Sequence, residues 1–191
     1  MPPKVRITDD AILDAALAIT REKGIDGVNV REIAKALDCS IQPVFRNFQS
    51  MENLKNALYQ RVEEEHNAAM EKGLQMHPIP FLGLGMAYIQ FAKEEKNLYK
   101  FLFMSAAIPK KGFLEMIKEE ENQPIVDLIA QMTGLPRKTA EELFMDIWLM
   151  VQGIASLVAT NDFEVSEAEI EKILKDTFLG LKMQLAKTEE Q

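Results

Sequence analysis

Residues 28–54, VNVREIAKALDCSIQPVFRNFQSMENL, predict two short helices joined by a tight turn and followed by the start of a third helix. Asn29 is a favourable N-cap for the first helix, and Glu32 follows three residues later, which is the spacing of a capping box. Asp38 and Cys39 interrupt the helical pattern and mark the turn, and Ser50 is the expected N-cap of the third helix. The buried face of the first helix consists of apolar residues at helical spacing: Ile33, Ala34 and Leu37.

The second helix of this segment has Ser40 as its expected N-cap, and its side chains fall into two arcs at about 100° per residue. The arc predicted to face the core holds Ile41, Val44, Phe45 and Phe48. The outer arc holds Gln42, Pro43, Arg46 and Asn47. A proline is tolerated here because first-turn amides lack partners inside the helix. Two short helices with a polar outer face on the second are typical of a helix-turn-helix that enters a major groove.

This segment resembles the DNA-binding domain of the TetR family of transcriptional regulators, over roughly residues 8–60. The shared pattern is a capped helix with an arginine, an Ile-Ala pair, a small turn, a serine, a Val-aromatic pair, a phenylalanine and Ser-x-Glu-x-Leu. In this chain those positions are Asn29, Arg31, Ile33, Ala34, Ser40, Val44, Phe45, Phe48, Ser50, Glu52 and Leu54. The resemblance implies a DNA-binding domain over residues 1–54 and a helical domain for ligand binding and dimerisation over residues 55–191.

Four positions depart from the family pattern. Phe45 replaces the usual tyrosine and Met51 the usual lysine, so two contacts to phosphate are missing. Asp38 stands where glycine is common in the turn, and Gln42 where glycine is frequent. Because these changes weaken the electrostatic contribution to DNA binding, they favour an alternative hypothesis. In it, a TetR-like helical protein with weakened DNA binding acts through a protein or small-ligand partner.

The predicted DNA-binding face follows from the outer arc and from the resemblance. We expect Gln42 and Arg46 to contact bases directly, because glutamine pairs with adenine and arginine with guanine. Ile41 and Pro43 are within reach of a thymine methyl group, although the periodicity also places Ile41 on the core arc. Arg31 matches a position that contacts DNA in several relatives, and Asn29 and Ser40 are candidates for phosphate contacts. The full predicted set is Asn29, Arg31, Ser40, Ile41, Gln42, Pro43, Phe45, Arg46 and Asn47; the alternative for this face is an ordinary polar helix surface.

The composition and the charge distribution limit the classes of protein to which this chain can belong. The net charge is −8, but residues 1–50 carry seven basic and seven acidic residues, so all the excess acid lies in residues 51–191. Phosphate contacts usually dominate affinity for DNA, so we expect modest non-specific binding. One cysteine cannot form an intramolecular disulfide. The longest apolar tract, Leu143–Ala159, is interrupted by Asp146 and Gln152, which predicts a cytoplasmic protein without a membrane span.

The rest of the chain predicts helices and no convincing strand, so the expected fold class is all-α. Pro78 and Pro80 separate the N-terminal domain from the body. The first helix begins after Thr8 and ends at Gly24, and the last begins at a capping box of Ser166 with Glu169. The helices expected between them are Met51 to about Gly73, Phe81–Lys93, Leu98–Ala107, Gly112–Glu120, Pro124–Met132 and 137–160.

The last two helices have more apolar surface than one chain can bury, which predicts a homodimer through a four-helix bundle. The TetR resemblance implies the same dimer. In the helix 137–160, the small residues Gly153, Ser156 and Thr160 form a strip that lets another helix come close. Such a dimer places two recognition helices roughly 34–36 Å apart, or a multiple of that, to bind a near-palindromic site on double-stranded DNA.

The resemblance also implies a pocket for a small-molecule effector in the body. Candidate lining residues are aromatic or methionine side chains: Phe81, Met86, Tyr88, Phe91, Tyr99, Phe103, Met104, Phe144 and Trp148. Plain core packing explains the same residues. Asp146 and Gln152 either orient a ligand or face a partner or solvent, and the acidity of the body favours a cationic or neutral apolar effector. His66 and His77 are the sole histidines and no catalytic motif is present, so no enzyme, metal site or cofactor is expected.

Overall fold

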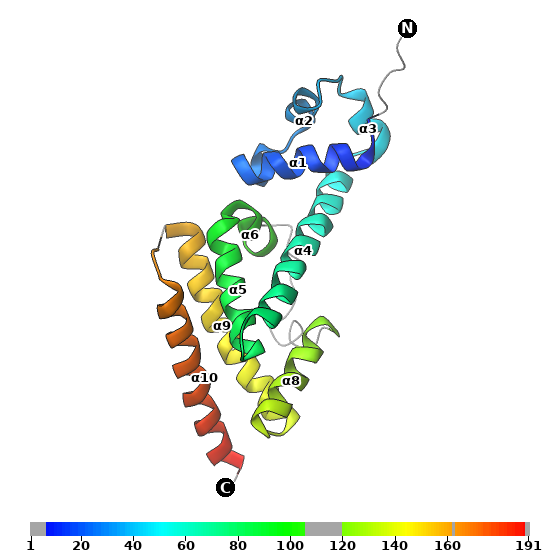
Figure 1. Ribbon diagram of the computed structural model, residues 1–191. Helices are drawn as coiled ribbons and strands as arrows, with labels where there is room; N and C mark the ends of the chain where they lie inside the picture. Colours follow the sequence, from blue (N-terminus) through cyan, green and yellow to red (C-terminus); the bar gives the residue numbers. More distant parts are fainter. Residues whose placement is uncertain (1–6, 106–119, 162, 190–191) are drawn as a thin grey trace. The chain divides into compact units, whose positions relative to one another are not determined.

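The chain is all-α, as predicted. The computed structural model describes residues 7–105, 120–161 and 163–189, and these residues form nine α-helices and two short 3₁₀ helices without any strand (Figure 1). Two compact units emerge from the contacts between residues. One unit combines Met1–Asn67 with Glu95–Ile108, and the other combines Ala68–Glu94 with Pro109–Gln191.

The N-terminal unit contains the predicted helix-turn-helix. Its elements are α1 (Asp9–Lys23), the 3₁₀ helix η1 (Ile25–Gly27), α2 (Val30–Ala36), α3 (Gln42–Phe48), the first part of α4 (Met51–Met76) and α6 (Lys96–Phe103). Helices α1, α2 and α3 contact one another, and α1 also contacts α6. The core is apolar and comes from each of the α-helices and from Val28 after η1; its members include Ile12, Ala16, Leu17, Val28, Ile33, Val44, Leu54, Leu58, Val62, Leu98 and Phe101.

Three predicted helix ends in this unit are confirmed. The Thr8 hydroxyl accepts a hydrogen bond from the Ala11 amide at 3.2 Å, and the Ser50 hydroxyl accepts one from the Asn53 amide at 3.1 Å. Gly24 ends α1 with φ +74° and donates its amide to the Thr20 carbonyl at 2.8 Å. Its ψ of 173° is extended, so the residue has the expected positive φ without the full left-handed helical conformation.

Helix α6 is tied to α1 by polar contacts inside the N-terminal unit. The Arg21 guanidinium donates to the Glu95 carboxylate at 3.1 Å and also pairs with Glu65 of α4. Asn97 donates its side-chain amide to the Arg21 carbonyl at 2.8 Å. One arginine near the end of α1 therefore links three helices that are distant in sequence.

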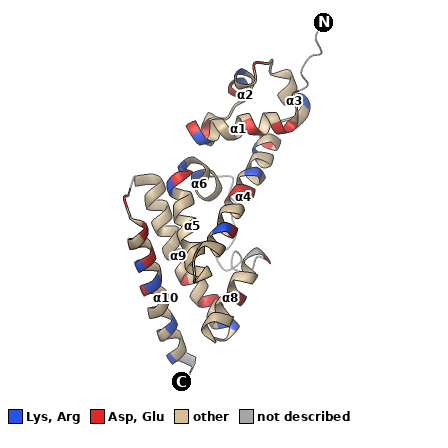
Figure 2. Cartoon of the chain, in the orientation of Figure 1, with Lys and Arg blue, Asp and Glu red and all other residues tan. Residues whose placement is uncertain are grey.

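The second unit is organised around α9 (Arg137–Asn161). Helices α5 (Pro80–Glu94), α8 (Gln123–Thr133) and α10 (Glu167–Glu189) all contact it, and α5 also contacts α8 and α10 (Figure 1). The 3₁₀ helix η2 (Glu120–Asn122) precedes α8. Figure 2 shows that α5 and α9 carry few charged residues, in contrast to α10. Buried apolar residues from all four helices form the core, among them Phe81, Leu82, Ile89, Val126, Ile129, Leu143, Ile147, Val151, Ala155, Val158, Ile170 and Leu174.

Most predicted helix limits in this unit lie within one or two residues of the observed ones. The capping box before α10 is confirmed: the Ser166 amide donates to the Glu169 carboxylate at 2.9 Å, and the Glu169 amide donates to the Ser166 hydroxyl at 3.3 Å. These hydrogen bonds lower the pKa of Glu169. Of the helix predicted over Gly112–Glu120, residues 112–119 lie outside the described part of the chain, and Glu120 begins η2 instead.

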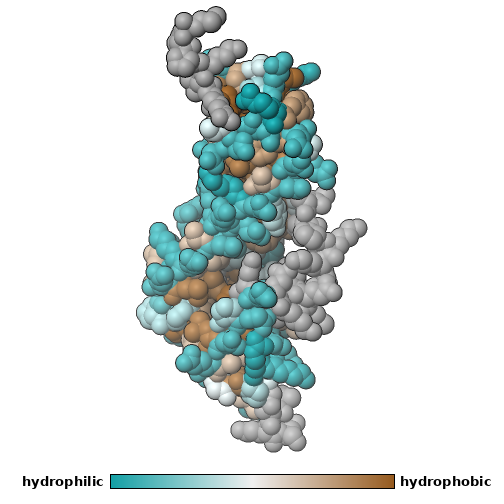
Figure 3. Space-filling view, turned by 90° about the vertical axis from the view of Figure 1, so that its right-hand side faces the viewer, coloured by the Kyte–Doolittle hydropathy of each residue, from teal (hydrophilic) through white to brown (hydrophobic). Residues whose placement is uncertain are grey.

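Helix α9 is long and apolar enough to cross a membrane by length and composition, in spite of Asp146 and Gln152. Among the described helices it alone meets that criterion. Its contacts with α5, α8 and α10 are those of a core helix in a globular domain. On the face of the molecule drawn in Figure 3, apolar residues of this unit also reach the surface in patches bordered by hydrophilic residues.

The end of α4 meets α5 at a pair of glycines. A Cβ atom added to Gly73 would lie 2.8 Å from the Gly83 carbonyl oxygen, and one added to Gly83 would overlap the Gly73 carbonyl oxygen and lie 2.9 Å from the His77 Cβ atom. Real Cβ atoms do not approach other atoms this closely, so the two backbones can touch only because neither position has a side chain.

We therefore expect Gly83→Ala to destabilise the protein by about 1–3 kcal/mol, because the added methyl group must push two backbones apart. Urea unfolding followed by circular dichroism measures this change. Gly85→Ala is the matched control on the same helix: its Cβ would lie 3.1 Å from a Leu174 methyl group, so a side chain and not a backbone must shift, and by less. The prediction is wrong if Gly83→Ala unfolds at the same urea concentration as Gly85→Ala.

Candidate nucleic-acid interface

The turn between α2 and α3 is built by the residues that interrupt the helical pattern. Leu37 ends α2, and the Cys39 amide donates to the Ala34 carbonyl at 2.9 Å while the Asp38 amide donates to the Lys35 carbonyl at 3.3 Å. This pair of hydrogen bonds is a Schellman motif, in which the residue after the cap adopts positive φ. Asp38 occupies that position with φ +47°, where glycine is the usual residue.

The predicted N-cap of α3 is wrong by one residue. Ile41 occupies the cap position with φ −70° and ψ −16°, and its side chain cannot cap. Gln42 and Pro43 open the helix, and because proline has no amide hydrogen, one of the first-turn donors needs no cap. Ser40 is exposed and precedes the helix.

Val44 fixes the rotation of α3 about its axis. It is 2% exposed and is the only fully buried residue of this helix, whereas Phe48 is half-buried. The core arc predicted for α3 is therefore partly wrong. Ile41 is 44% exposed and Phe45 is 45% exposed, so these two large apolar side chains lie on the surface. Of the seven residues of this two-turn helix, Val44 alone is buried, three are half-buried and three are exposed.

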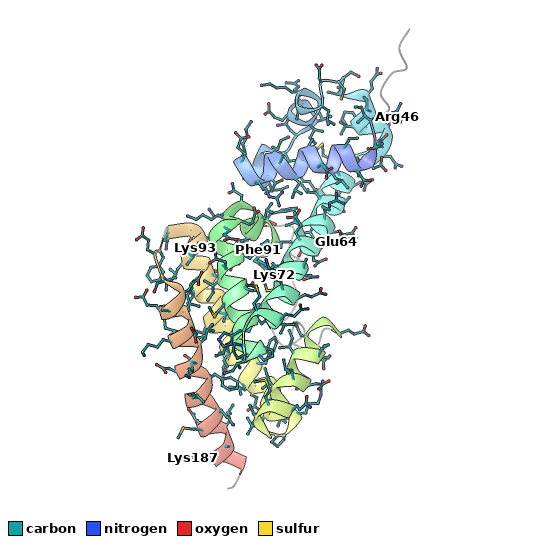
Figure 4. All side chains as sticks on the ribbon, in the orientation of Figure 1. Arg46, Glu64, Lys72, Phe91, Lys93 and Lys187 are labelled. Atoms are coloured by element: carbon teal, nitrogen blue, oxygen red, sulfur yellow. The ribbon has the colours of Figure 1, made fainter. Side chains whose placement is uncertain are left out.

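Of the four residues in the predicted outer arc of α3, Gln42 and Arg46 lie at the surface, whereas Pro43 and Asn47 are half-buried. Gln42 and Arg46 are both exposed, one helical turn apart, and Figure 4 shows the Arg46 side chain projecting outward from α3. The Arg46 guanidinium donates to the Asn47 side-chain oxygen in a weak contact of 3.5 Å. Pro43 is half-buried, and Arg31 is exposed on α2. Arg46 is the sole charged residue between Asp38 and Glu52.

Two asparagines of the predicted face have structural partners within the protein. The Asn29 side-chain oxygen accepts from the Arg31 and Glu32 amides, each at 3.1 Å, and its amide group donates to the Gly27 carbonyl at 3.3 Å. This confirms the predicted N-cap. Asn47 donates its side-chain amide to the Ile7 carbonyl at 3.3 Å, which ties α3 to the residues before α1.

Glu32 completes an ion pair in place of the expected reciprocal cap. Its carboxylate accepts from the Lys23 ammonium at 2.9 Å, which links α2 to the end of α1. The hydrogen bond raises the pKa of Lys23 and lowers the pKa of Glu32. Both side chains are exposed, so the pair orients α2 without adding much stability.

Two short helices, a tight turn between them and an exposed polar face on the second define a helix-turn-helix protein of the DNA-binding class. The family model of bacterial regulatory proteins of the tetR family matches residues 12–58, and that of the tetracyclin repressor-like C-terminal domain matches residues 81–178. The chain belongs to the TetR family of transcriptional regulators, with its helix-turn-helix as the DNA-binding domain.

The chain is similar in sequence to a known regulator and in fold to solved structures. The uncharacterized HTH-type transcriptional regulator YvkB of Bacillus subtilis (strain 168) is 26% identical over 166 residues, covering 87% of this chain and 78% of the relative. A protein with unknown function from Rhodococcus sp. RHA1 shares the fold with a TM-score of 0.73 at 19% identity, covering 95% and 100% of the two chains. The multidrug binding protein EbrR, in complex with imidazole, has a TM-score of 0.53 at 16% identity, covering 88% of each.

The nine candidate pocket residues divide between the two units. Tyr99, Phe103 and Met104 belong to the N-terminal unit, where the Tyr99 and Phe103 rings lie 5.1 Å apart and the His66 ring lies 5.2 Å from Phe103. Burial lowers the pKa of His66. Met104 is exposed. The members in the second unit are mostly buried or half-buried side chains on α5 and α9: Phe81, Met86, Tyr88, Phe91, Phe144 and Trp148.

Within the second unit, one polar pair joins α5 to α9. The Tyr88 hydroxyl donates to the Gln152 side-chain oxygen, and Tyr88 is buried. The sequence predicts separate roles for Tyr88 and Gln152 and does not predict that they pair. Asp146 is exposed. Among the described residues, no group of three or more His, Cys, Asp or Glu side chains is arranged to hold a metal ion.

Helices α9 and α10 both carry exposed apolar residues. The large ones are Leu149, Leu157, Ile173, Leu179 and Met183. Gly153 of α9 and Gly180 of α10 are exposed, and a Cβ atom at either would meet nothing within 4 Å. A single chain therefore leaves apolar surface and small residues uncovered on both of its last two helices.

We expect Asn29→Ala to destabilise the N-terminal unit by about 1 kcal/mol, because two amides at the start of α2 lose their acceptor. Asn29→Ser keeps a capping oxygen and should retain most of the stability. Thermal unfolding of both variants measures the difference. Equal loss in the two variants would show that the cap contributes nothing measurable and that another property of Asn29 matters.

Proposed function

We propose that this TetR-family regulator is a ligand-responsive repressor that acts in the cytoplasm as a homodimer on a near-palindromic operator. The observation that supports this best is the exposure of Gln42 and Arg46 on α3 while Val44 anchors the same helix in the core. The recognition helix of a helix-turn-helix needs this combination, because a rigid inner face must hold an outer face that reaches base edges. Residues 1–54 form the proposed DNA-binding domain, and residues 55–191 the regulatory domain.

In the proposed complex, Gln42 pairs with adenine and Arg46 with guanine in the major groove. Arg31 contacts the DNA from α2. Of the phosphate candidates, Ser40 is exposed and free to turn toward the backbone, whereas the side chain of Asn29 already caps α2. The remaining proposed contacts come from the surface of α3 and its start: Ile41, Pro43, Phe45 and Asn47.

The proposed homodimer is supported by the uncovered apolar side chains of α9 and α10. Pairing these helices with those of a second copy about a two-fold axis makes a four-helix bundle, and the exposed glycines allow close approach. A two-fold dimer carries two α3 helices, and a near-palindromic operator offers each of them the same half-site.

The proposed effector is a small apolar or cationic molecule bound among the helices of the second unit. Support comes from the buried Tyr88 hydroxyl beside Gln152, a polar pair in an otherwise apolar region that can orient a ligand. EbrR, which shares the fold, is a multidrug binding protein whose structure contains imidazole. By analogy of fold, it supports a small-molecule effector for this chain. Effector binding would favour a dimer geometry with altered half-site spacing, so that affinity for the operator falls through a population shift.

The test of DNA binding is titration of duplexes from upstream of the gene, followed by fluorescence anisotropy at several salt concentrations. Arg46→Ala should weaken operator binding about 5- to 150-fold, since a bidentate arginine–guanine contact is worth roughly 1–3 kcal/mol. Lys72→Ala is the matched control, because it removes one exposed positive charge from α4 outside the helix-turn-helix. If no duplex binds in an Arg46-dependent manner, the alternative of a protein acting through another partner replaces this proposal.

The dimer is tested separately. Leu157→Lys combined with Leu179→Lys should give a folded monomer in analytical ultracentrifugation. Both side chains are exposed in a single chain, and in the proposed bundle they would contact α9 and α10 of the second copy. Met132→Lys, an equally large exposed apolar residue on α8, should leave the dimer intact. A monomeric wild-type protein, or a double variant that remains dimeric, contradicts the proposed interface.

A further inference from the structure

The outer surface of α3 has an apolar row beside its polar row. Ile41 and Phe45 are four residues apart, as are Gln42 and Arg46, so each pair lies along one line of the helix surface. Ile41 and Phe45 are 44% and 45% exposed. The recognition helix therefore offers two large apolar side chains alongside its two predicted base-reading side chains.

The apolar core of the N-terminal unit is filled without the side chains of Ile41 and Phe45. Val44 is already the buried contact of α3, and Ile12, Ile33 and Leu54 fill the core around it with no exposure at all. Exposure of isoleucine and phenylalanine side chains to water is unfavourable, so a partner surface that covers them would be stabilising.

The charge and the apolar side chains of α3 indicate which kind of surface would cover Ile41 and Phe45. Arg46 is the sole charge between Asp38 and Glu52, so the helix is weakly positive and has no acidic side chain that would repel DNA. In the major groove, the apolar group that a base presents is the 5-methyl group of thymine. Because Phe45 has no phenol hydroxyl, its ring has no hydrogen bond to offer to phosphate and remains free for apolar contact.

We infer that Ile41 and Phe45 read thymine methyl groups in the operator half-site, next to the bases that Gln42 and Arg46 contact. This inference rests on the proposed DNA-binding function and adds to it a chemical requirement on the operator. Sequence preference then comes partly from methyl groups, at positions where the protein makes no hydrogen bond to the base.

The experiment replaces thymine by uracil, which removes the methyl group and leaves base pairing intact. Duplexes are first selected from a random pool with the full-length protein, and each half-site thymine of the best duplex is then replaced in turn by deoxyuridine. Wild-type protein should lose about four-fold in affinity for each methyl group that contacts the apolar row, the effect expected for one buried carbon. Phe45→Ala or Ile41→Ala should bind the thymine and uracil duplexes equally at the position that it reads.

Gln42→Ala is the matched control: it should bind more weakly but remain sensitive to uracil. Thermal unfolding checks that the variants stay folded, which is expected because Ile41 and Phe45 are exposed. Arg46-dependent binding that ignores every uracil substitution overturns the inference and leaves the proposed function standing. Uracil sensitivity that persists in both alanine variants also overturns it, because another part of the protein would then read the methyl group. No Arg46-dependent binding at all refutes the proposed function itself.

Discussion

The burial of Val44 is the constraint on which the helix-turn-helix depends. Helix α3 has only two turns, too few to be stable in water alone, so its packing on the N-terminal core decides its position. Because Val44 is its one fully buried side chain, it also decides which residues point outward. Because Val44 holds the helix in one rotation, the proposed base-reading side chains of Gln42 and Arg46 stay at the surface.

Much of the fold could be predicted because local signals and long-range packing agree. Thr8, Asn29, Ser50 and Ser166 cap the helices that they were expected to cap, since a short polar side chain before an apolar pattern has few other roles. Prolines and glycines predicted the ends of most helices of the second unit to within one or two residues of the observed ends. Such ends are decided within four residues of chain, so sequence alone is sufficient.

The errors at α3 have a different origin. Periodicity assigned Ile41 and Phe45 to the core because it treats a helix as if a core covered half of its surface. Here Val44 is fully buried but Phe48 only half-buried, and that extent depends on how α1 and α2 contact α3, which periodicity does not consider. Likewise, the pairing of Tyr88 with Gln152 depends on how α5 meets α9, a relation between positions 64 residues apart. These relations decide the candidate sites, which is why the sites were less predictable than the helices.

The weak charge of the N-terminal domain fits a regulator that depends on shape and base contacts more than on attraction to phosphate. Residues 1–50 are neutral overall, so little counterion release is available to hold the protein on random DNA. Attraction to phosphate contributes to specific and non-specific binding alike, so discrimination between sites depends on the contacts with bases. The inferred methyl contacts of Ile41 and Phe45 would add to this discrimination, because their contribution is gained where methyl groups match and is lost elsewhere. A protein with this surface would bind DNA poorly in general and yet select its operator well.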